Sequence, residues 1–148
     1  MRLYELAQRF YGMREIAGDQ HNGFIQWAHS LCGLDPETAD EVSWCSSFLN
    51  AVCWILRLPR SKSAKARSWL AIGLPVNLLH AREGDVIILK RGAMDAGRDD
   101  LEAPGHVGLF AGVEDGKVFV LGGNQSDAVN VKSFPISKIL GIRRLSPL

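Results

Sequence analysis

The chain has 148 residues, of which 47% are hydrophobic and 22% charged, a balance typical of one globular domain covering residues 1–148. With 17 basic and 16 acidic residues, its formal net charge is +1, which excludes a general electrostatic attraction to nucleic acid. No stretch approaches the roughly 18 apolar residues of a membrane-spanning helix, so we expect no membrane insertion.

Residues 1–10 contain neither a long apolar segment nor the small-residue cleavage site of a signal peptide, and we therefore expect synthesis in the cytoplasm. The three cysteines, Cys32, Cys45 and Cys53, are odd in number and form no C-x-x-C pair. This pattern argues against a disulfide framework and against a structural zinc site. We also expect no cofactor.

Apolar residues at helical spacing predict four helices in the first half of the chain, about residues 1–73. The expected helices span residues 3–11, 23–31, 42–57 and 64–72. Pro59 follows the third helix and Gly73 the fourth, and both residue types commonly end helices.

From about residue 84 to 148 the pattern changes to short apolar runs bounded by turn residues. Strands are expected at residues 84–90, 105–113, 117–121, 128–134 and 139–145, with a hairpin turn at 114–116 and a loop at 122–127. Helices first and hairpin-linked strands second predict an α+β fold, with the N-terminal helices packed on a roughly five-stranded antiparallel sheet.

Cys45 lies between Trp44 and Ser46 near the start of the third expected helix. The backbone N–H groups and positive dipole at a helix N-terminus favour a thiolate, which is the form that acts as a nucleophile. On position alone, a small buried residue at a helix start is an equally good interpretation.

A cysteine nucleophile needs a base, and four histidines are available: His21, His29, His80 and His106. Only His106 opens a strand of the expected sheet, where Gly105 and Gly108 leave room for a substrate. The alternative is a strand histidine bonded to a local carbonyl group.

Hairpin pairing of residues 105–113 with 117–121 would bring His106 near Asn124 and Gln125. An amide oxygen there would accept a hydrogen bond from the imidazole and fix its tautomer. We predict Asn124 for this role with Gln125 as its rival, although an asparagine beside two glycines is equally typical of a turn.

The segments at residues 40–50, 66–70, 84–86, 105–108 and 121–126 together resemble a phage-associated branch of the NlpC/P60 and CHAP superfamily. These proteins are papain-like cysteine hydrolases that cut amide bonds in bacterial peptidoglycan. The resemblance covers nearly the whole chain and implies a papain-like NlpC/P60 fold with the nucleophile at a helix N-terminus.

The resemblance implies that Cys45 is the nucleophile, His106 the general base and Asn124 the residue that orients the base. Many CHAP domains place a glutamate two residues before this asparagine, where this chain has Gly122, so a four-residue site is incomplete. The Asp-x-Asp-Gly spacing of the calcium-binding members is also missing, which again predicts no metal.

In the expected mechanism, the Cys45 thiolate attacks a carbonyl of the stem peptide, and the Cys45 backbone N–H holds the oxyanion. The Gln125 side chain is a candidate second donor. Trp44 and Trp69 are candidates to line the cleft, with core packing as the alternative. Glu41 is a candidate to contact the substrate, with a favourable charge at the helix N-terminus as the alternative.

The sequence thus predicts a cysteine peptidase or amidase acting on peptidoglycan, either an endolysin or a secreted cell-wall-degrading effector. Its expected partner is the peptidoglycan stem peptide, joined by an immunity or inhibitor protein if it is a toxin, and its expected site of action is the periplasm or cell wall. Two alternatives stay open: a catalytically silent or repurposed binding module of the same fold, and an acyltransferase that uses the same Cys–His pair.

Overall fold

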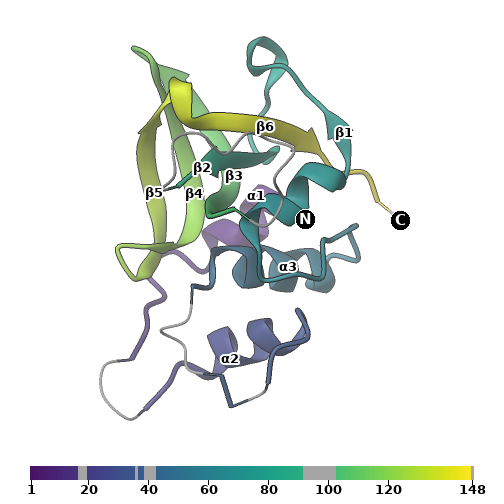
Figure 1. Ribbon diagram of the computed structural model, residues 1–148, viewed down its shortest axis with the longest axis vertical. Helices are drawn as coiled ribbons and strands as arrows, with labels where there is room; N and C mark the ends of the chain where they lie inside the picture. Colours follow the sequence, from purple (N-terminus) through teal and green to yellow (C-terminus); the bar gives the residue numbers. More distant parts are fainter. Residues whose placement is uncertain (17–19, 36, 39–42, 92–102, 148) are drawn as a thin grey trace.

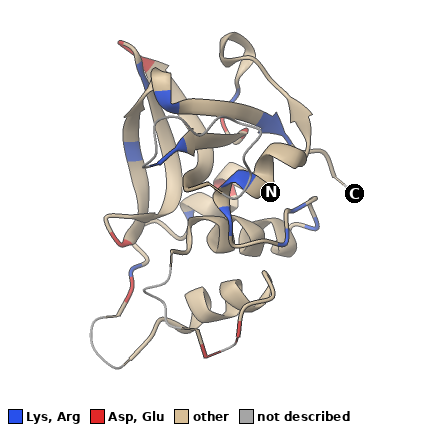
Figure 2. Ribbon diagram, in the orientation of Figure 1, with Lys and Arg blue, Asp and Glu red and all other residues tan. Residues whose placement is uncertain are grey.

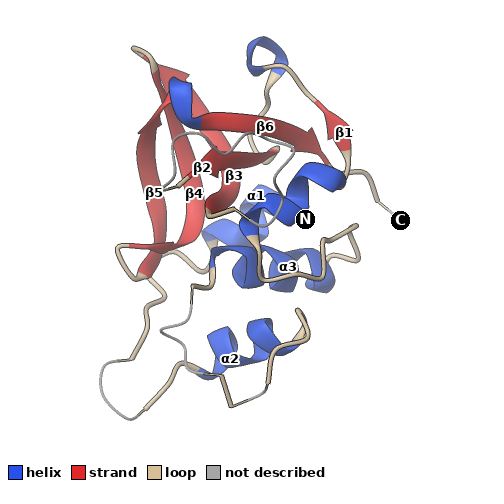
Figure 3. Ribbon diagram, in the orientation of Figure 1, coloured by secondary structure: helices blue, strands red, loops and turns tan. Residues whose placement is uncertain are grey.

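The computed structural model describes residues 1–16, 20–35, 37–38, 43–91 and 103–147. The helices in this part of the chain are α1 (Leu3–Gln8), α2 (Gly23–Ser30), α3 (Cys45–Ile55) and the 3-10 helices η1 (Ala66–Ala71), η2 (Leu78–His80) and η3 (Ile136–Lys138). The strands are β1 (Leu74–Pro75), β2 (Val86–Lys90), β3 (Gly105–Glu114), β4 (Lys117–Gln125), β5 (Ala128–Pro135) and β6 (Ile139–Arg144) (Figures 1 and 3).

The described strands form one antiparallel sheet in the order β1-β6-β2-β3-β4-β5, which confirms the predicted α+β class. β2 to β6 correspond to the five strands expected from the sequence. The sixth, β1, has only two residues, too few for a hydrophobic pattern to reveal it, and it pairs with the end of β6.

Several predicted boundaries were wrong, among them the end of α1, which lies at Gln8 rather than at residue 11. The expected fourth helix is a single 3-10 segment, Ala66–Ala71, and α3 begins at Cys45 and ends at Ile55. The predicted loop at residues 122–127 is also wrong over residues 122–125, because β4 continues to Gln125, which pairs with Ala128 of β5.

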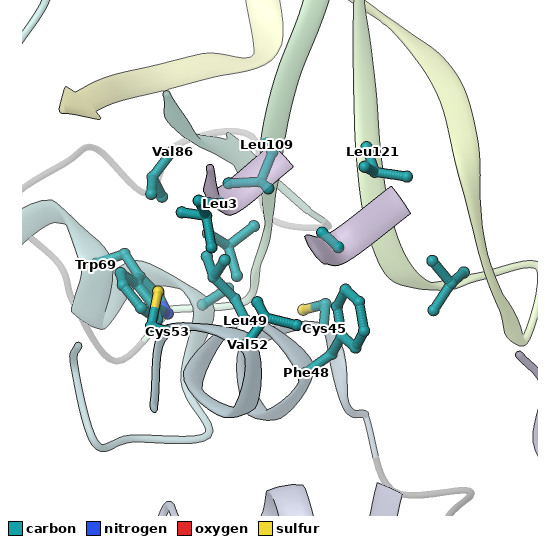
Figure 4. Packing of buried hydrophobic residues seen from close by; sticks show 14 of the residues in the cluster. Leu3, Cys45, Phe48, Leu49, Val52, Cys53, Trp69, Val86, Leu109 and Leu121 are labelled. Carbon is teal, nitrogen blue, oxygen red and sulfur yellow. The ribbon is translucent and has the colours of Figure 1, made fainter. Parts of the chain in front are cut away.

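The helices cover one face of the sheet, with α3 between the sheet and α2 (Figures 1 and 3). Figure 4 shows the contact, in which apolar side chains of α3 meet those of the strands. On the α3 side it contains Trp44, Phe48, Leu49 and Val52, and on the sheet side Val86, Val107, Leu109 and Leu121. A smaller apolar cluster, which includes Ile87, Phe110 and Val120, forms a second part of the core.

A close approach between Gly123 on β4 and Trp44 fixes how α3 meets the sheet. A Cβ atom on Gly123 would lie 2.5 Å from Cζ3 of the Trp44 ring and 3.1 Å from Cβ of Phe48. Only glycine leaves space for this ring, and Trp44 is completely buried. Because Trp44 is the residue directly before α3, this contact also sets the position of Cys45.

In the part of the chain that the structure describes, no helix is long and apolar enough to cross a membrane.

We predict that Gly123→Ala lowers the free energy of unfolding by about 1–3 kcal/mol, since an added methyl group must displace the Trp44 ring in a packed core. Gly23→Ala is the matched control, because its Cβ would meet nothing within 4 Å at the first residue of α2. Urea unfolding measures both variants. Equal urea midpoints for Gly123→Ala and Gly23→Ala would show that the Trp44 ring moves aside without a loss of stability.

Candidate active site

Cys45 is the first residue of α3, and its side chain lies beside Phe48 between the helix and the sheet (Figure 4). The first hydrogen bond of this helix runs from the Phe48 N–H to the Trp44 carbonyl, at 2.8 Å. The N–H groups of Cys45, Ser46 and Ser47 therefore have no acceptor within the helix and give its N-terminus a positive potential. Cys45 is 2% exposed, so its thiol lies in a site largely shielded from water.

Burial raises the pKa of the Cys45 thiol, but the opposing effects are larger and the net pKa is lowered. The largest of them is a hydrogen bond with the side chain of His106, followed by the charge of His106, a hydrogen bond from the Val107 backbone and the charge of Arg91. By contrast, burial raises the pKa of Cys32, and it raises that of Cys53 to about 12. Of the three cysteines, only Cys45 has an environment that favours the thiolate.

A buried amide determines how His106 is oriented. The Nε2 atom of His106 lies 2.9 Å from Oε1 of Gln125, and both residues are buried. The amide nitrogen of Gln125 donates to the Val120 carbonyl at 3.2 Å and to the Asn130 carbonyl at 2.8 Å, so the amide cannot be flipped without losing both bonds.

Since Oε1 of Gln125 can only accept, Nε2 of His106 must carry the proton and donate it. The neutral imidazole then has an unprotonated Nδ1, which is the ring nitrogen left for the thiol of Cys45. This tautomer is the one in which His106 can take the proton of Cys45 and form a thiolate–imidazolium pair.

Asn124 does not orient His106, contrary to the prediction. Its side-chain nitrogen donates to Oγ of Ser43 at 3.2 Å instead. Extending the Leu109–Leu121 pairing of β3 and β4 would place Asn124 opposite His106. However, β4 has an irregularity between Gly122 and Gln125, where Asn124 adopts a left-handed backbone with φ 58°. One extra residue in a strand reverses the side-chain alternation, and Gln125 reaches His106 instead.

The glycine at position 122, where many CHAP domains have a glutamate, is compatible with the contact between Gln125 and His106. A Cβ atom on Gly122 would lie 3.0 Å from Oε1 of Gln125, which is closer than most such contacts. A side chain here would press on the oxygen that accepts from His106. A residue with a Cβ at position 122 would therefore require the Gln125 amide to shift by a few tenths of an ångström, whereas glycine leaves it in place.

The other predicted site residues have different positions. Gln125 cannot be the second oxyanion donor, because its amide nitrogen is already bonded to backbone carbonyls. Trp44 and Trp69 are completely buried and do not line a cleft. Glu41 lies outside the described residues.

Both tryptophans instead hold the N-terminus of α3. The indole N–H of Trp44 donates to Oε1 of Glu15 at 2.8 Å, and that of Trp69 to Oγ of Ser46 at 2.9 Å. Ser46 in turn donates to the Ser63 carbonyl at 2.6 Å. These bonds fix the residues on both sides of Cys45.

Sequence reasoning missed Asn130 and Phe134, which complete the surroundings of the histidine. Asn130 donates to the Gln125 carbonyl at 2.8 Å and accepts from the Gln125 amide. The ring of Phe134 lies against His106, with centroids 5.4 Å apart. Both residues are on β5, and no spacing in the sequence pointed to them because the bulge in β4 decides which residues of β5 face the site.

His29 has a contact of its own on α3. Nδ1 of His29 is 2.7 Å from Oγ of Ser47, a buried contact that joins α2 to α3. Among the described residues, no group of three or more histidine, cysteine or acidic side chains has the geometry to hold a metal ion.

Comparisons with known proteins give no assignment, since no protein-family model matches the chain and a search of curated proteins finds no match.

We predict that iodoacetamide labels Cys45 before Cys32 and Cys53 near neutral pH, as found by peptide mass mapping. In His106→Ala the pH midpoint of Cys45 labelling should move above that of an ordinary thiol, because burial remains while the hydrogen bond and charge of His106 are lost. His80→Ala, at an exposed position, is the control and should keep the wild-type midpoint. Faster labelling of Cys32 than of Cys45 would contradict the assignment.

We predict that Gln125→Ala releases the fixed tautomer of His106, because Nε2 loses its acceptor. The imidazole nitrogen chemical shifts should change from a single Nε2-protonated form to a mixture, and unfolding should become easier by about 1–3 kcal/mol as the Val120 and Asn130 carbonyls lose a donor. Asn124→Gly, which tolerates the left-handed backbone, should keep the wild-type tautomer. If Asn124→Gly changes the tautomer and Gln125→Ala does not, the orienting residue is misassigned.

Proposed function

We propose that the protein is a cysteine hydrolase of the papain-like NlpC/P60 and CHAP type that cleaves an amide bond in the peptide part of bacterial peptidoglycan. The observation that carries this proposal is the set formed by Cys45 at a helix N-terminus, His106 beside it, and Gln125 behind His106. Nucleophile, base and orienting amide follow one another in a chain of contacts, which is the arrangement that thiol acyl-transfer chemistry needs.

In the first half of the reaction, Nδ1 of His106 takes the proton of Cys45. The thiolate then attacks the substrate carbonyl carbon and forms a tetrahedral oxyanion. The backbone N–H of Cys45, at the positive end of α3, is the donor placed to hold that oxyanion. The Nδ1–H of His106 protonates the leaving nitrogen, the C–N bond breaks, and the acyl group stays on the sulfur as a thioester.

In the second half, a water molecule replaces the departed amine beside His106. Nδ1 removes one proton from the water as its oxygen attacks the thioester carbonyl. Collapse of the second oxyanion breaks the C–S bond, releases a carboxylic acid, and returns the proton to the sulfur. Gln125 keeps Nε2 protonated throughout both halves, so that Nδ1 is the only nitrogen that exchanges protons.

The peptidoglycan substrate rests on the resemblance of the segments at residues 40–50, 66–70, 84–86, 105–108 and 121–126 to this superfamily. An endolysin and a delivered effector use the same chemistry, so they differ in how the enzyme reaches the wall rather than in the site. Two outcomes of the test below would name another function: acyl transfer to an amine, or binding without cleavage.

Purified peptidoglycan is the substrate for the test, with zymography for activity and mass spectrometry of the soluble products. We predict that the wild-type protein clears the gel and that Cys45→Ala does not. Cys45→Ser should be nearly as inactive, because a serine hydroxyl stays protonated in a site that is adapted to a thiolate. Cys32→Ser is the matched control, and we expect it to remain active.

Product masses separate the outcomes. Fragments that gain one water indicate hydrolysis, and fragments joined to an added amine indicate acyl transfer. Clearing by Cys45→Ala would refute the nucleophile, and absence of any cleavage by the wild-type protein, together with retention on the wall, would make it a binding module.

A further inference from the structure

A cavity of about 220 Å³ opens directly beside His106. Its lining includes four basic side chains: Lys90 at the end of β2, Arg91 after it, Lys132 on β5 and Lys138 at the end of η3. Figure 2 shows in blue where lysines and arginines lie along the ribbon. Asn124 and Ser126 add polar groups, and Phe134 forms an apolar wall. None of the described residues that line the cavity is acidic.

The four cations are not neutralised by described neighbours. The ion pairs found between described residues join Arg2 to Glu5 and Glu83, and Arg144 to Asp85. The Lys132 ammonium group lies 6.0 Å from the centre of the Phe134 ring, at the limit of a cation–π contact. Such a set of like charges around one small cavity favours an anion inside it.

His106 is shared between this cavity and the thiol of Cys45, because it hydrogen-bonds Cys45 and also lines the cavity. In the reaction proposed above, the leaving nitrogen must lie beside the imidazole to receive its proton. The atoms attached to that nitrogen are therefore the part of the substrate that extends toward the cavity.

We propose that the cavity binds a carboxylate on the leaving side of the substrate, and that the preferred substrates are peptides with a free carboxylate next to the scissile bond on that side. The inference rests on the proposed hydrolase function. The cavity is smaller than the roughly 300–1,000 Å³ of pockets for drug-sized ligands, which suits one small amino acid. Stem peptides provide such a group either at their C-terminus or on a side chain.

The test compares hydrolysis of a stem peptide with that of derivatives in which one carboxylate at a time, C-terminal or side-chain, is converted to its amide. With the wild-type protein, one amidation should lower kcat/KM about tenfold, and its position identifies which carboxylate is bound. The double variant Lys132→Gln/Lys138→Gln should hydrolyse that acid about tenfold more slowly than wild type, a few-fold loss for each exposed charge, and should not distinguish it from its amide. Added salt should weaken the wild-type preference.

Lys117→Gln is the matched control, because Lys117 is exposed at the opposite end of β4 from Gln125 and should keep the full preference for the acid. Equal rates for the acid and every amide with the wild-type protein would overturn the carboxylate site while leaving the hydrolase intact. The carboxylate site would also be overturned if the double variant slowed hydrolysis of the acid and of its amide by the same factor.

If no peptide is cleaved, the hydrolase proposal fails, and binding of the same peptides then tests the cavity alone. The acid should bind the wild-type protein more tightly than its amide in calorimetry, and the double variant should remove the difference. Equal binding of the two forms, or competition by inorganic phosphate but not by acetate, would overturn the carboxylate assignment.

Discussion

The orientation of one buried amide determines the chemistry of this site. The side-chain nitrogen of Gln125 donates to two backbone carbonyls, which fixes the direction of its side-chain oxygen. Nε2 of His106 lies in that direction, 2.9 Å from the oxygen. A flipped amide would place a donor against Nε2 and lose the hydrogen bonds to the Val120 and Asn130 carbonyls, at a cost of about 0.5–1.5 kcal/mol for each lost bond. This cost is large enough to keep a single tautomer of His106, and with it a single nitrogen for the thiol of Cys45.

The same amide depends on the irregularity in β4. Asn124 takes up a left-handed backbone, which for a residue other than glycine is uncommon but favourable for asparagine. The bulge turns Gln125 toward His106. Asn130 then fixes Gln125 in this position, because its side chain donates to the Gln125 carbonyl and accepts from the Gln125 amide. A bulge beside a reactive residue is a common way to aim a side chain that regular strand geometry would point elsewhere.

Cys45 is held by a different set of contacts, all from its immediate neighbours. Trp44 fits against Gly123 and donates to Glu15, while Ser46 bonds Trp69 and Ser63. The residues before and after the thiol are thus fixed to the sheet and to η1. Buried packing around α3 therefore fixes the position of the Cys45 thiol. Its protonation state depends on His106 and Gln125, which lie on the sheet.

The sequence was sufficient for the fold class, for the five longer strands and for the elements that carry Cys45 and His106. These rest on hydrophobic period and on turn residues, which are local properties. It was not sufficient for the choice between Asn124 and Gln125, because that choice depends on a bulge whose only local sign is an asparagine after two glycines. The sequence also could not decide whether Trp44 and Trp69 belong to the core or line a cleft. An aromatic ring suits either role until its burial is known.

Burial separates two kinds of interaction around His106. On the Cys45 side, groups 2% and 4% exposed interact in a medium where a hydrogen bond to a charged group contributes about 1.5–3 kcal/mol. On the cavity side, Lys132 and Lys138 are exposed, and an exposed ion pair contributes about 0.2–1 kcal/mol and is screened by salt. The buried contacts are therefore strong enough to set the ionisation of Cys45, whereas the exposed cations have only the strength needed for the proposed discrimination among substrates. In the proposed hydrolase, catalysis and selection of the substrate would thus meet at the His106 imidazole but rest on interactions of different strength.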